Sequence, residues 1–425
     1  MRYLYYNRTM SFSEKWFNRS NESLEGISTD EFIGYVQPKT QEAITMDGIR
    51  DQLDSGHPLN VKFGTDPTGP DLHLGHVVPI RVLDLFSRAG HNIDLVFGDF
   101  TAKVGDPSGR SNERPLLSDS TISENVSTFR DQVDKYFDTH TSNVKVSNNS
   151  AWLDEMSLSD VFEYLQETNL SEAMQRRDFR KRILAGKAIS LAEAFYPTMM
   201  GIDSVELKTD IEIGGIDQLL NFQQTRKVQR NQGQVPEDVI MTPILEGTSG
   251  GGVKMSKSLG NYVPLNATPD EVYGKMMSIP DDIVLNYITA FAPVHTDEVS
   301  GLKQSIESRP LEMKKQLATY LAALSISNMD DGLAARERFE RRFARKEFAE
   351  DDMEKLVSGS ALIDSLTATG KYKSRNEIRR LAKQGGIKLD GTSLSEDEVM
   401  TTTPPIGSIV TVGKRTIFRI AKSEE

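Results

Sequence analysis

The chain has 425 residues, of which 37% are hydrophobic and 26% are charged. This length predicts two or three domains, and the apolar content is high enough to form cores, which argues against a largely disordered chain. The formal net charge of −12 argues against a uniformly basic nucleic-acid-binding surface, although it leaves room for local basic patches.

The sequence contains no cysteine, which excludes a disulfide framework and zinc sites with cysteine ligands. It has no run of 18 apolar residues, so we expect no membrane-spanning helix and no membrane partner. Residues 1–18 lack the apolar stretch of a secretory signal. A cytoplasmic enzyme is therefore the default interpretation.

Residues 1–35 are polar, with clusters of Asn and Ser, and we expect a peripheral N-terminal extension to which the sequence assigns no role. The stretch Val61–Gly64 is typical of a short buried strand and His73–Ala89 of a helix. Ile93–Gly98 and Leu207–Gly215 predict further strands. Strands that alternate with helices predict a parallel α/β sheet, which binds its ligands beyond the carboxyl ends of its strands.

The longer pattern predicts several domains. Residues 119–195 have the pattern of helices, which we interpret as an insertion in a Rossmann-like catalytic domain spanning residues 36–265. An α-helical domain is expected over residues 266–350. Residues 355–425 predict a small α+β module that begins with a basic helix at Arg375–Gln384 and ends in a pair of strands.

The first chemical signal lies between the first predicted strand and its helix. The loop there begins at Asp66, and His73 and His76 then share one face of the first helical turn. The unpaired N–H groups and partial positive charge of such a turn suit a phosphate. Gly75 would let a nucleotide approach the backbone closely. Taken alone, the two histidines could also cap the helix, pack in the core or bind a metal.

A second signal is the stretch Lys254-Met255-Ser256-Lys257-Ser258, which follows a Gly-rich loop at residues 247–252. Two lysines on a flexible loop can close on a triphosphate and neutralise charge as pyrophosphate departs. The alternative for this stretch alone is an ordinary solvated loop.

A third loop, Gly105–Gly109, contains Asp106 and is followed by Arg110 and Arg114. The sequence Asp-Pro-Ser-Gly is also common in surface turns. The position of the loop after a predicted central strand favours a role in ligand binding.

These motifs, in this order, resemble the two ATP-binding signatures of class I aminoacyl-tRNA synthetases. Over roughly residues 36–425 the chain is similar to bacterial tyrosyl-tRNA synthetases. The shared elements are Gly64-x-Asp66-Pro67-Thr68, His73-Leu74-Gly75-His76, Gly105–Gly109, Tyr196, Asp203, Gly214–Gln218 and Lys254–Ser258. The C-terminal module resembles an S4-type RNA-binding domain, and residues 266–350 would then be the anticodon-recognition domain.

The resemblance implies a two-step reaction without a covalent enzyme intermediate. L-Tyrosine and ATP with Mg²⁺ would give tyrosyl-adenylate and pyrophosphate, and the tyrosyl group would then pass to the 3′ end of tRNA(Tyr). ATP is a substrate here, and neither a tightly bound cofactor nor a resident metal is expected. The resemblance also implies a homodimer that forms through the helical insertion.

The resemblance further assigns roles to single residues. Thr68 and His73 would bind the γ-phosphate end of ATP and His76 the nucleotide. Asp106 would bind the substrate ammonium, and Asp203 would accept a hydrogen bond from the substrate phenol. Other ATP contacts would come from Gly64, Asp66, Gly75, Gly215 and Asp217. The leaving pyrophosphate would be stabilised by Lys254, Lys257, Arg110 and Arg114, and the amino-acid pocket would also contain Lys62, Tyr196, Met200 and Gln218.

The chain departs from the family pattern at two positions. Lys62 stands where many members have a tyrosine that meets the substrate phenol. Met200 stands where the family usually has a glutamine near the substrate amine. These departures keep open a related synthetase that activates a different amino acid. A non-catalytic RNA-binding relic of a synthetase is a further alternative.

Basic residues concentrate in three runs, 176–182, 336–346 and 371–383. Each run alone could be a solvated helix face, but three runs on an acidic chain favour a polyanionic partner. The residues expected to contact tRNA are Arg176, Arg177, Arg180, Arg182, Lys373, Arg375, Arg379 and Arg380. By the resemblance, the first run would meet the acceptor stem and the last the long arm of the tRNA.

Overall fold

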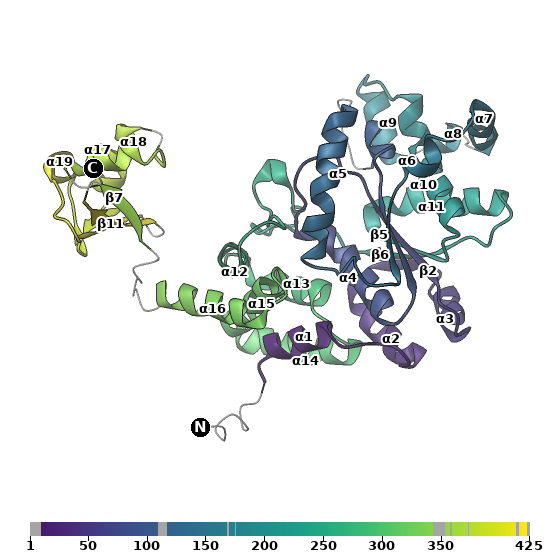
Figure 1. The fold of residues 1–425 in the computed structure, drawn as a ribbon, viewed down its shortest axis with the longest axis horizontal. Coiled ribbons are helices and arrows are strands. Elements are labelled where there is room, and N and C mark those ends of the chain that lie inside the picture. Colours follow the sequence, from purple (N-terminus) through teal and green to yellow (C-terminus); the bar gives the residue numbers. More distant parts are fainter. Residues whose placement is uncertain are drawn as a thin grey trace. The chain divides into compact units, whose positions relative to one another are not determined.

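The fold was analysed in a computed structural model of the chain. The structure describes residues 10–108, 117–167, 170–174, 176–342, 353–357, 359–372, 374–413 and 416–422. The chain divides into two compact units, Met1–Phe339 and Glu340–Glu425 (Figure 1), and each has a hydrophobic core of its own. The predicted catalytic and helical domains therefore share one unit.

The described residues of the larger unit form a six-stranded sheet in the order β1-β6-β5-β2-β3-β4. Its strands are β1 (Glu42–Ile44), β2 (Asn60–Thr65), β3 (Asn92–Phe97), β4 (Val144–Asn148), β5 (Ile211–Gly215) and β6 (Asp238–Thr242). Only the edge strand β1 runs antiparallel to its neighbour. The predicted parallel α/β sheet is thus confirmed, and β1 was not predicted.

Strand β2 lies between β3 and β5, which places the first parallel strand in the middle of the sheet. From β2 the chain proceeds outward through β3 and β4 on one side, and later through β5 and β6 on the other. Such a reversal of strand order opens a crevice beyond the carboxyl ends of the strands on either side of it. The crevice here lies beyond β2 and β5.

Helices surround this sheet. In the first part of the larger unit they are α1 (Phe12–Ser20), α2 (Thr29–Val36), α3 (Met46–Asp54), α4 (Leu74–Arg88), α5 (Asp119–Asp134), α6 (Ser150–Leu153), α7 (Leu158–Glu167), α8 (Leu170–Ala173), α9 (Arg177–Leu184), α10 (Leu191–Leu207) and α11 (Leu219–Asn231). The helical part contains α12 (Pro269–Met277), α13 (Val284–Phe291), α14 (Thr296–Ser308), α15 (Pro310–Leu324) and α16 (Met329–Glu340).

Helix α4 is the element that carries the first motif. Val78, Val82 and Phe86 recur every four residues and are at most 1% exposed, so this face packs on the sheet, where α4 contacts β2, β3 and β5. The burial fixes the axis of α4, and its first turn therefore meets the carboxyl end of β2.

Two predictions about the middle of the chain require correction. Residues 119–195 are mostly helical as expected, but they include β4, which pairs with β3. The sequence of this edge strand is largely polar and only partly buried, which hides the alternation of a strand. The strand predicted from Leu207 begins at Ile211 instead, because α10 continues to Leu207 and ends at Lys208 in a left-handed conformation.

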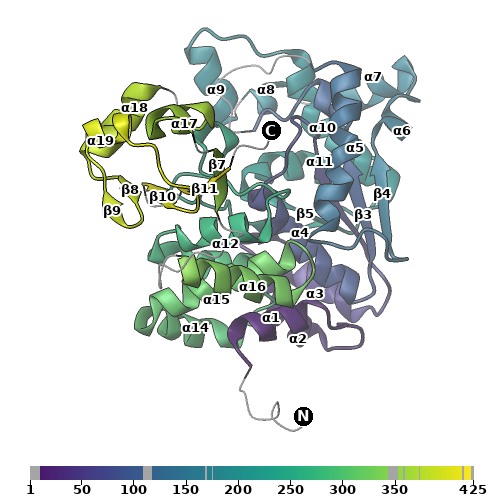
Figure 2. The ribbon, with the colours of Figure 1, turned by 60° about the vertical axis from the view of Figure 1, so that its left-hand side comes forward.

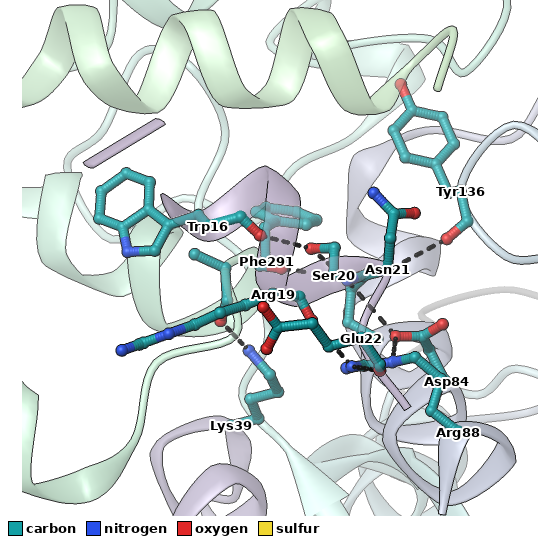
Figure 3. A network of polar contacts seen from close by, with 12 residues as sticks. Trp16, Arg19, Ser20, Asn21, Glu22, Lys39, Asp84, Arg88, Tyr136 and Phe291 are labelled. Atoms are coloured by element: carbon teal, nitrogen blue, oxygen red, sulfur yellow. Dashed lines mark hydrogen bonds and ion pairs between the residues drawn. The ribbon is translucent and has the colours of Figure 1, made fainter. Parts of the chain in front are cut away.

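The prediction of a peripheral extension at residues 1–35 is wrong for the described residues. Trp16, Phe32 and Ile33 are at most 3% exposed and belong to the main core. Figure 3 shows α1 held in a polar network, in which the hydroxyl of Ser20 donates to the carbonyl of Trp16 and Arg88 donates to the carbonyl of Arg19. The hydroxyl of Ser20 also forms a hydrogen bond with that of Tyr320. Polar residues of this stretch therefore form hydrogen bonds within the larger unit.

Lys39 belongs to the same region and is fully buried. Its Nζ atom donates to the carbonyl oxygens of Thr289 and Ala292, 2.8 and 2.5 Å away, at the C-terminal end of α13. Burial, with Arg81 and Arg88 nearby, holds the pKa of Lys39 well below its usual value. Lys39 thus satisfies carbonyl groups that the end of a helix leaves without partners.

The smaller unit confirms the predicted α+β module. Its sheet has the order β7-β11-β10-β8-β9, and Figure 2 shows α17 and α18 on one side of β10 and β11. Its elements are β7 (Glu354–Val357), α17 (Leu362–Ala368), α18 (Arg375–Lys383), β8 (Ile387–Leu389), β9 (Thr392–Ser393), α19 (Glu396–Thr401), β10 (Ile409–Val412) and β11 (Thr416–Ala421). Across the described residues, no helix combines the length and apolar character needed to span a membrane.

Candidate active site

A cavity of about 360 Å³ opens beyond the carboxyl ends of β2 and β5. This volume lies within the usual range for pockets that bind small ligands. Residues predicted from separate motifs meet in its wall. They are Lys62, Gly64, Asp66, Thr68, His73, Gly75, His76, Asp106, Tyr196, Met200, Asp203, Gly215, Asp217, Gln218 and Lys254. Arg110 and Arg114 lie outside the described residues.

The two histidines of the first motif cap α4. His73 is the residue before the helix, and its Nδ1 accepts a hydrogen bond from the backbone N–H of Gly75 at 3.2 Å. In return, Nδ1 of His76 accepts from the backbone N–H of His73 at 3.2 Å. A Cβ atom at Gly75 would lie 2.9 Å from the His73 ring, so glycine is required for this cap.

The capping also sets the protonation of both rings. Nδ1 of His73 accepts a hydrogen bond, so the proton of that neutral imidazole sits on Nε2, which is then a donor. Nδ1 of His76 lies 3.2 Å from the backbone nitrogen of His73 and 3.3 Å from its carbonyl oxygen, so the cap accommodates either tautomer of that ring. Burial, His76 and the lysines of the second motif lower the pKa of His73 to about 2, and burial lowers that of His76 to about 4. At neutral pH both rings are therefore uncharged, and each has one ring N–H donor.

The second motif ends a hairpin that closes on the first. The backbone N–H of Met255 donates to the carbonyl of Leu245 at 2.9 Å. Asn261 then fixes the motif from behind, since its Oδ1 accepts from the backbone N–H of Ser256 and its Nδ2 donates to the carbonyl of Lys254. A Cβ atom at Gly69 would lie 3.3 Å from Nζ of Lys257. The ammonium group of Lys257 therefore lies against the loop of the first motif.

A carboxylate at the end of β2 joins two other elements. Oδ1 of Asp66 accepts from the hydroxyl of Thr101 at 2.8 Å, and its Oδ2 accepts from the hydroxyl of Tyr196 at 3.0 Å. The Tyr196 oxygen keeps lone pairs that can accept a further hydrogen bond from a ligand.

Asp106 is held by a second set of side chains. Gln218 donates to its Oδ2 at 2.7 Å, and Asn221 donates to its Oδ1 at 3.2 Å. Asn221 is fully buried and in turn accepts from Arg176 at 2.7 Å. Arg176 also donates to the hydroxyl of Ser108 at 3.1 Å, so this arginine fixes the loop that carries Asp106.

Asp203 on α10 lines the cavity and is 6% exposed. Its Oδ1 accepts from the indole N–H of Trp152 at 2.8 Å and its Oδ2 from Asn149 at 3.3 Å. Burial is the largest cause that raises the pKa of Asp203 to about 7, while Lys62 acts in the opposite direction. Asn149 and Trp152 were not predicted, because they lie in a stretch without a motif.

Lys62 reaches the cavity wall but its donors are occupied. Its Nζ atom contacts Oε1 of Glu212 at 2.9 Å, the hydroxyl of Ser204 at 2.5 Å and the carbonyl of Met200 at 3.2 Å. An ammonium group has three protons, so none is left for a substrate. The prediction that Lys62 binds the amino acid directly is therefore wrong.

Gly215 and Asp217 border the cavity at the end of β5. A Cβ atom at Gly215 would lie 2.6 Å from Oδ1 of Asp217, so glycine lets this carboxylate fold back over the strand end. Burial and the nearby Asp106 raise the pKa of Asp217 above its usual value.

The chain matches a family model described as "tRNA synthetases class I (W and Y)" over residues 54–344. It is also 36% identical over 404 residues to the tyrosine–tRNA ligase of Symbiobacterium thermophilum, covering 93% of this chain and 98% of that protein. The tyrosine–tRNA ligase of Aquifex aeolicus is 36% identical over 397 residues, with 93% and 99% covered. The chain belongs to the class I tyrosine–tRNA ligases.

Solved structures agree on the fold of this synthetase. A tyrosyl-tRNA synthetase from Archaeoglobus fulgidus, complexed with L-tyrosine, has a TM-score of 0.59 at 21% identity and covers 73% of this chain and 100% of that chain. A C-terminally truncated mitochondrial enzyme from Aspergillus nidulans has a TM-score of 0.60 at 22% identity, with 78% and 99% covered. The Rossmann-like class I fold is thereby confirmed.

The basic residues of this synthetase fall into distinct groups. Arg176 and Arg182 are buried, and Arg182 pairs with Glu193 at 2.7 Å, so the prediction that these two contact tRNA requires correction. Arg180 and Arg380 are exposed. Arg375 and Arg379 are at least partly exposed and form ion pairs with Asp364 and Glu396. Lys373 and the side chain of Arg177 lie outside the described residues.

Proposed function

We propose that the protein activates L-tyrosine with ATP and Mg²⁺ to tyrosyl-adenylate and pyrophosphate, and then transfers the tyrosyl group to the 3′ end of tRNA(Tyr). The observation that carries this proposal is one cavity lined by residues of two different kinds. Neutral histidines and a motif lysine are in its wall, and so is the buried acceptor Asp203. This combination suits a triphosphate and a phenol, which we assign to two ends of the cavity.

At the amino-acid end, Asp203 would accept a hydrogen bond from the substrate phenol. Phenylalanine would leave this buried acceptor without the donor, and tyrosine–tRNA ligases are themselves a documented example of selection by that rule. Asp106 and the oxygen of Tyr196 would accept from the substrate ammonium. Gln218 supports this assignment, because it orients Asp106.

At the ATP end, the Nε2–H groups of His73 and His76 would donate to phosphate oxygens, with Thr68 beside them. Lys254 and Lys257 would neutralise the charge that develops on the leaving pyrophosphate. Asp217 would accept from the ribose. Mg²⁺ would arrive with ATP as part of the substrate. The roles of Arg110 and Arg114 stay predictions.

The chemistry requires no covalent bond to the enzyme. An oxygen of the tyrosine carboxylate attacks the α-phosphorus of ATP, a new P–O bond forms, and the bond to the bridging oxygen of pyrophosphate breaks. In the second step a terminal ribose hydroxyl of the tRNA attacks the carbonyl carbon and AMP leaves. The residues of the cavity then act by positioning the reactants and stabilising charge.

We further propose a homodimer that forms through the helical insertion. Large apolar side chains on α7–α10 and at their ends are exposed in the single chain, and contiguous exposed apolar surface is typical of interfaces. They are Leu158, Phe162, Leu165, Leu170, Ile183, Leu184 and Leu191. Exposed Arg180 and the basic helix α18 would contact tRNA. The cytoplasm stays the predicted compartment.

One feature favours a second candidate, a related synthetase that activates a different amino acid. Met200 supplies a thioether in the cavity wall where the family usually has an amide near the substrate amine. The loss of that polar contact would weaken binding of any amino acid, and it leaves the buried acceptor Asp203 unchanged. Our assignment of tyrosine as the substrate therefore rests on Asp203.

The test is ATP–pyrophosphate exchange with tyrosine, phenylalanine, tryptophan and no amino acid in parallel. Exchange that depends on tyrosine alone is the expected result. Exchange with a different amino acid would move the function to a related synthetase. A protein that binds tRNA(Tyr) without any exchange would be a non-catalytic relic.

A further inference from the structure

We infer that Lys62 is a positioning residue for tyrosine selection, which acts by clamping the turn of α10 that carries Asp203 and by facing Asp203 with a positive charge. This inference rests on the proposed function, in which Asp203 accepts from the substrate phenol. In this inference, Lys62 and its partner Glu212 affect the choice of amino acid by positioning Asp203. Neither residue contacts the ligand.

The clamp joins three elements of the larger unit. Lys62 on β2 and Glu212 on β5 are directly opposite each other in the parallel pair, and both are 2% exposed. From this pair the ammonium group extends to α10, where it donates to the carbonyl of Met200 and the hydroxyl of Ser204. The two strands at the switch in strand order are thus tied to one turn of the helix.

Asp203 lies inside that turn, between the two residues that Lys62 contacts. The carbonyl of Met200 accepts at 3.2 Å and the hydroxyl of Ser204 accepts at 2.5 Å, on either side of Asp203 in the sequence. Trp152 and Asn149 donate hydrogen bonds to the carboxylate itself. Without Lys62, Trp152 and Asn149 alone would hold the Asp203 carboxylate, while the backbone of this turn of α10 would be less restrained.

The charges around Asp203 give Lys62 a second effect. The ionisable groups that face this region are Lys62, Glu212, Tyr196 and, behind Lys62, Glu237. Glu237 is 1% exposed, and burial together with Glu212 raises its pKa well above the usual value. Among these groups Lys62 is the cation that favours the ionised form of Asp203, and its influence on Asp203 exceeds that of Glu212.

The first experiment compares Lys62→Met with the double variant Lys62→Met/Glu212→Gln in the full chain. The double variant matters because the single change leaves Glu212 buried without its cation, which is destabilising. In both variants we expect the ratio of kcat/KM for tyrosine to that for phenylalanine to fall by about tenfold, a typical coupling between residues in one network. ATP–pyrophosphate exchange measures both amino acids.

The matched control is Lys39→Met, which removes another fully buried lysine that also donates to carbonyl groups. Lys39 contacts the end of α13 and does not line the cavity. We expect this variant to lower the melting temperature and to leave the tyrosine-to-phenylalanine ratio unchanged. A fall in the ratio in this control as well would show that general destabilisation, and not the clamp, lowers selectivity.

The pH profile separates positioning from a purely structural role. An ionised Asp203 is the stronger acceptor, so kcat/KM for tyrosine should rise through the pKa of Asp203 of about 7 and level off above it. Loss of the Lys62 charge should move this rise to higher pH by about one unit, because a neighbouring cation favours the carboxylate. Phenylalanine donates nothing to Asp203, so its profile should lack this rise in every variant.

The outcomes distinguish the inference from the proposed function. A wild-type protein without tyrosine-dependent exchange refutes the proposed function. A wild-type protein that uses tyrosine, with folded Lys62 variants that keep both the ratio and the pH profile, refutes the inference alone. Should neither Lys62 variant fold, Ser204→Ala removes one contact of the clamp, and an unchanged ratio in that variant would equally overturn the inference.

Discussion

In the proposed function, His73 and His76 each combine a structural role with a chemical one. Each ring uses Nδ1 in the cap of α4, and both rings line the cavity. A low pKa keeps both rings neutral, so that their donors do not depend on pH near neutrality. The sequence left capping as an alternative to phosphate binding. In the proposed function the two are compatible, because the cap would hold both rings in place for a phosphate.

This double role predicts different effects of two substitutions at His73. Asparagine is a good N-cap residue, so His73→Asn should keep the melting temperature but lower the rate of adenylate formation by about tenfold or more through loss of the Nε2 donor. His73→Ala should show the same loss of rate and also destabilise the protein by about 1 kcal/mol. Exchange kinetics and urea denaturation measure the two effects. Wild-type rates in His73→Asn would contradict the chemical role.

Asp203 and Asp217 allow the two ends of the cavity to be tested separately. Asp203→Ala should erode discrimination between tyrosine and phenylalanine by about tenfold or more, since hydrogen bonds to a charged acceptor are strong. Asp217→Ala should instead raise KM for ATP and leave that discrimination intact. Steady-state exchange kinetics with tyrosine and with phenylalanine measure both effects. Unchanged discrimination in Asp203→Ala would remove the phenol pocket from this end of the cavity.

Residues in motifs could be placed from the sequence, and residues outside motifs could not. Thr68, His73 and Asp217 line the cavity as expected. Asn149 and Trp152 reach Asp203 only because β4 runs beside β3, a tertiary relation that no local pattern contains. The sequence likewise could not predict that all N–H donors of Lys62 have partners, since one partner is Glu212 in the neighbouring strand.

At the scale of elements, helix α9 separates two arginines that look equivalent in the basic run. Arg180 is exposed, whereas Arg182 is 1% exposed and pairs with Glu193 at the start of α10. The spacing of two residues on a helix places them on different faces. A basic run therefore predicts a charged segment but does not tell which members remain available to a partner.

The two arginines should respond oppositely to substitution. Arg180→Ala should weaken tRNA binding and lower the slope of log affinity against log salt by about one, with the melting temperature unchanged. Arg182→Ala should cost about 3–5 kcal/mol of stability, because Glu193 stays buried without its partner. Filter binding at several salt concentrations and chemical denaturation distinguish them. Equal salt slopes for Arg180→Ala and wild type would exclude a phosphate contact at Arg180.

Elements with strong periodicity were predicted and those without it were not. Helix α4 and strands β2 and β3 follow clear apolar patterns, and their bounds agree with expectation to within a residue or two. Helix α1 was missed because Ser and Asn residues dominate its surroundings, and their hydrogen bonds to distant elements cannot be seen locally. Strand β4 was missed because an edge strand buries few of its side chains.

At the scale of the whole molecule, the division into two units predicts that activation and tRNA charging can be separated. The cavity is lined entirely by residues of the larger unit, and each unit has its own core. Removal of residues 340–425 should leave tyrosine-dependent exchange close to that of the full chain and should strongly reduce aminoacylation of tRNA(Tyr). Full charging by the shortened protein would refute the role of the smaller unit in tRNA binding.

The docking of α1 has a consequence for the synthesis of the chain. Ser13 and Ser20 form hydrogen bonds with Gln316 and Tyr320, which come 303 and 300 residues later in the sequence. Ribosomes add about 5–20 residues per second, so the partners of α1 are made on the order of 15–60 seconds after α1 itself. During that interval Trp16 lacks its final packing against Tyr320 and is available to chaperones. The larger unit therefore cannot complete its fold until α15, one of its last helices, has been synthesised and packs against α1.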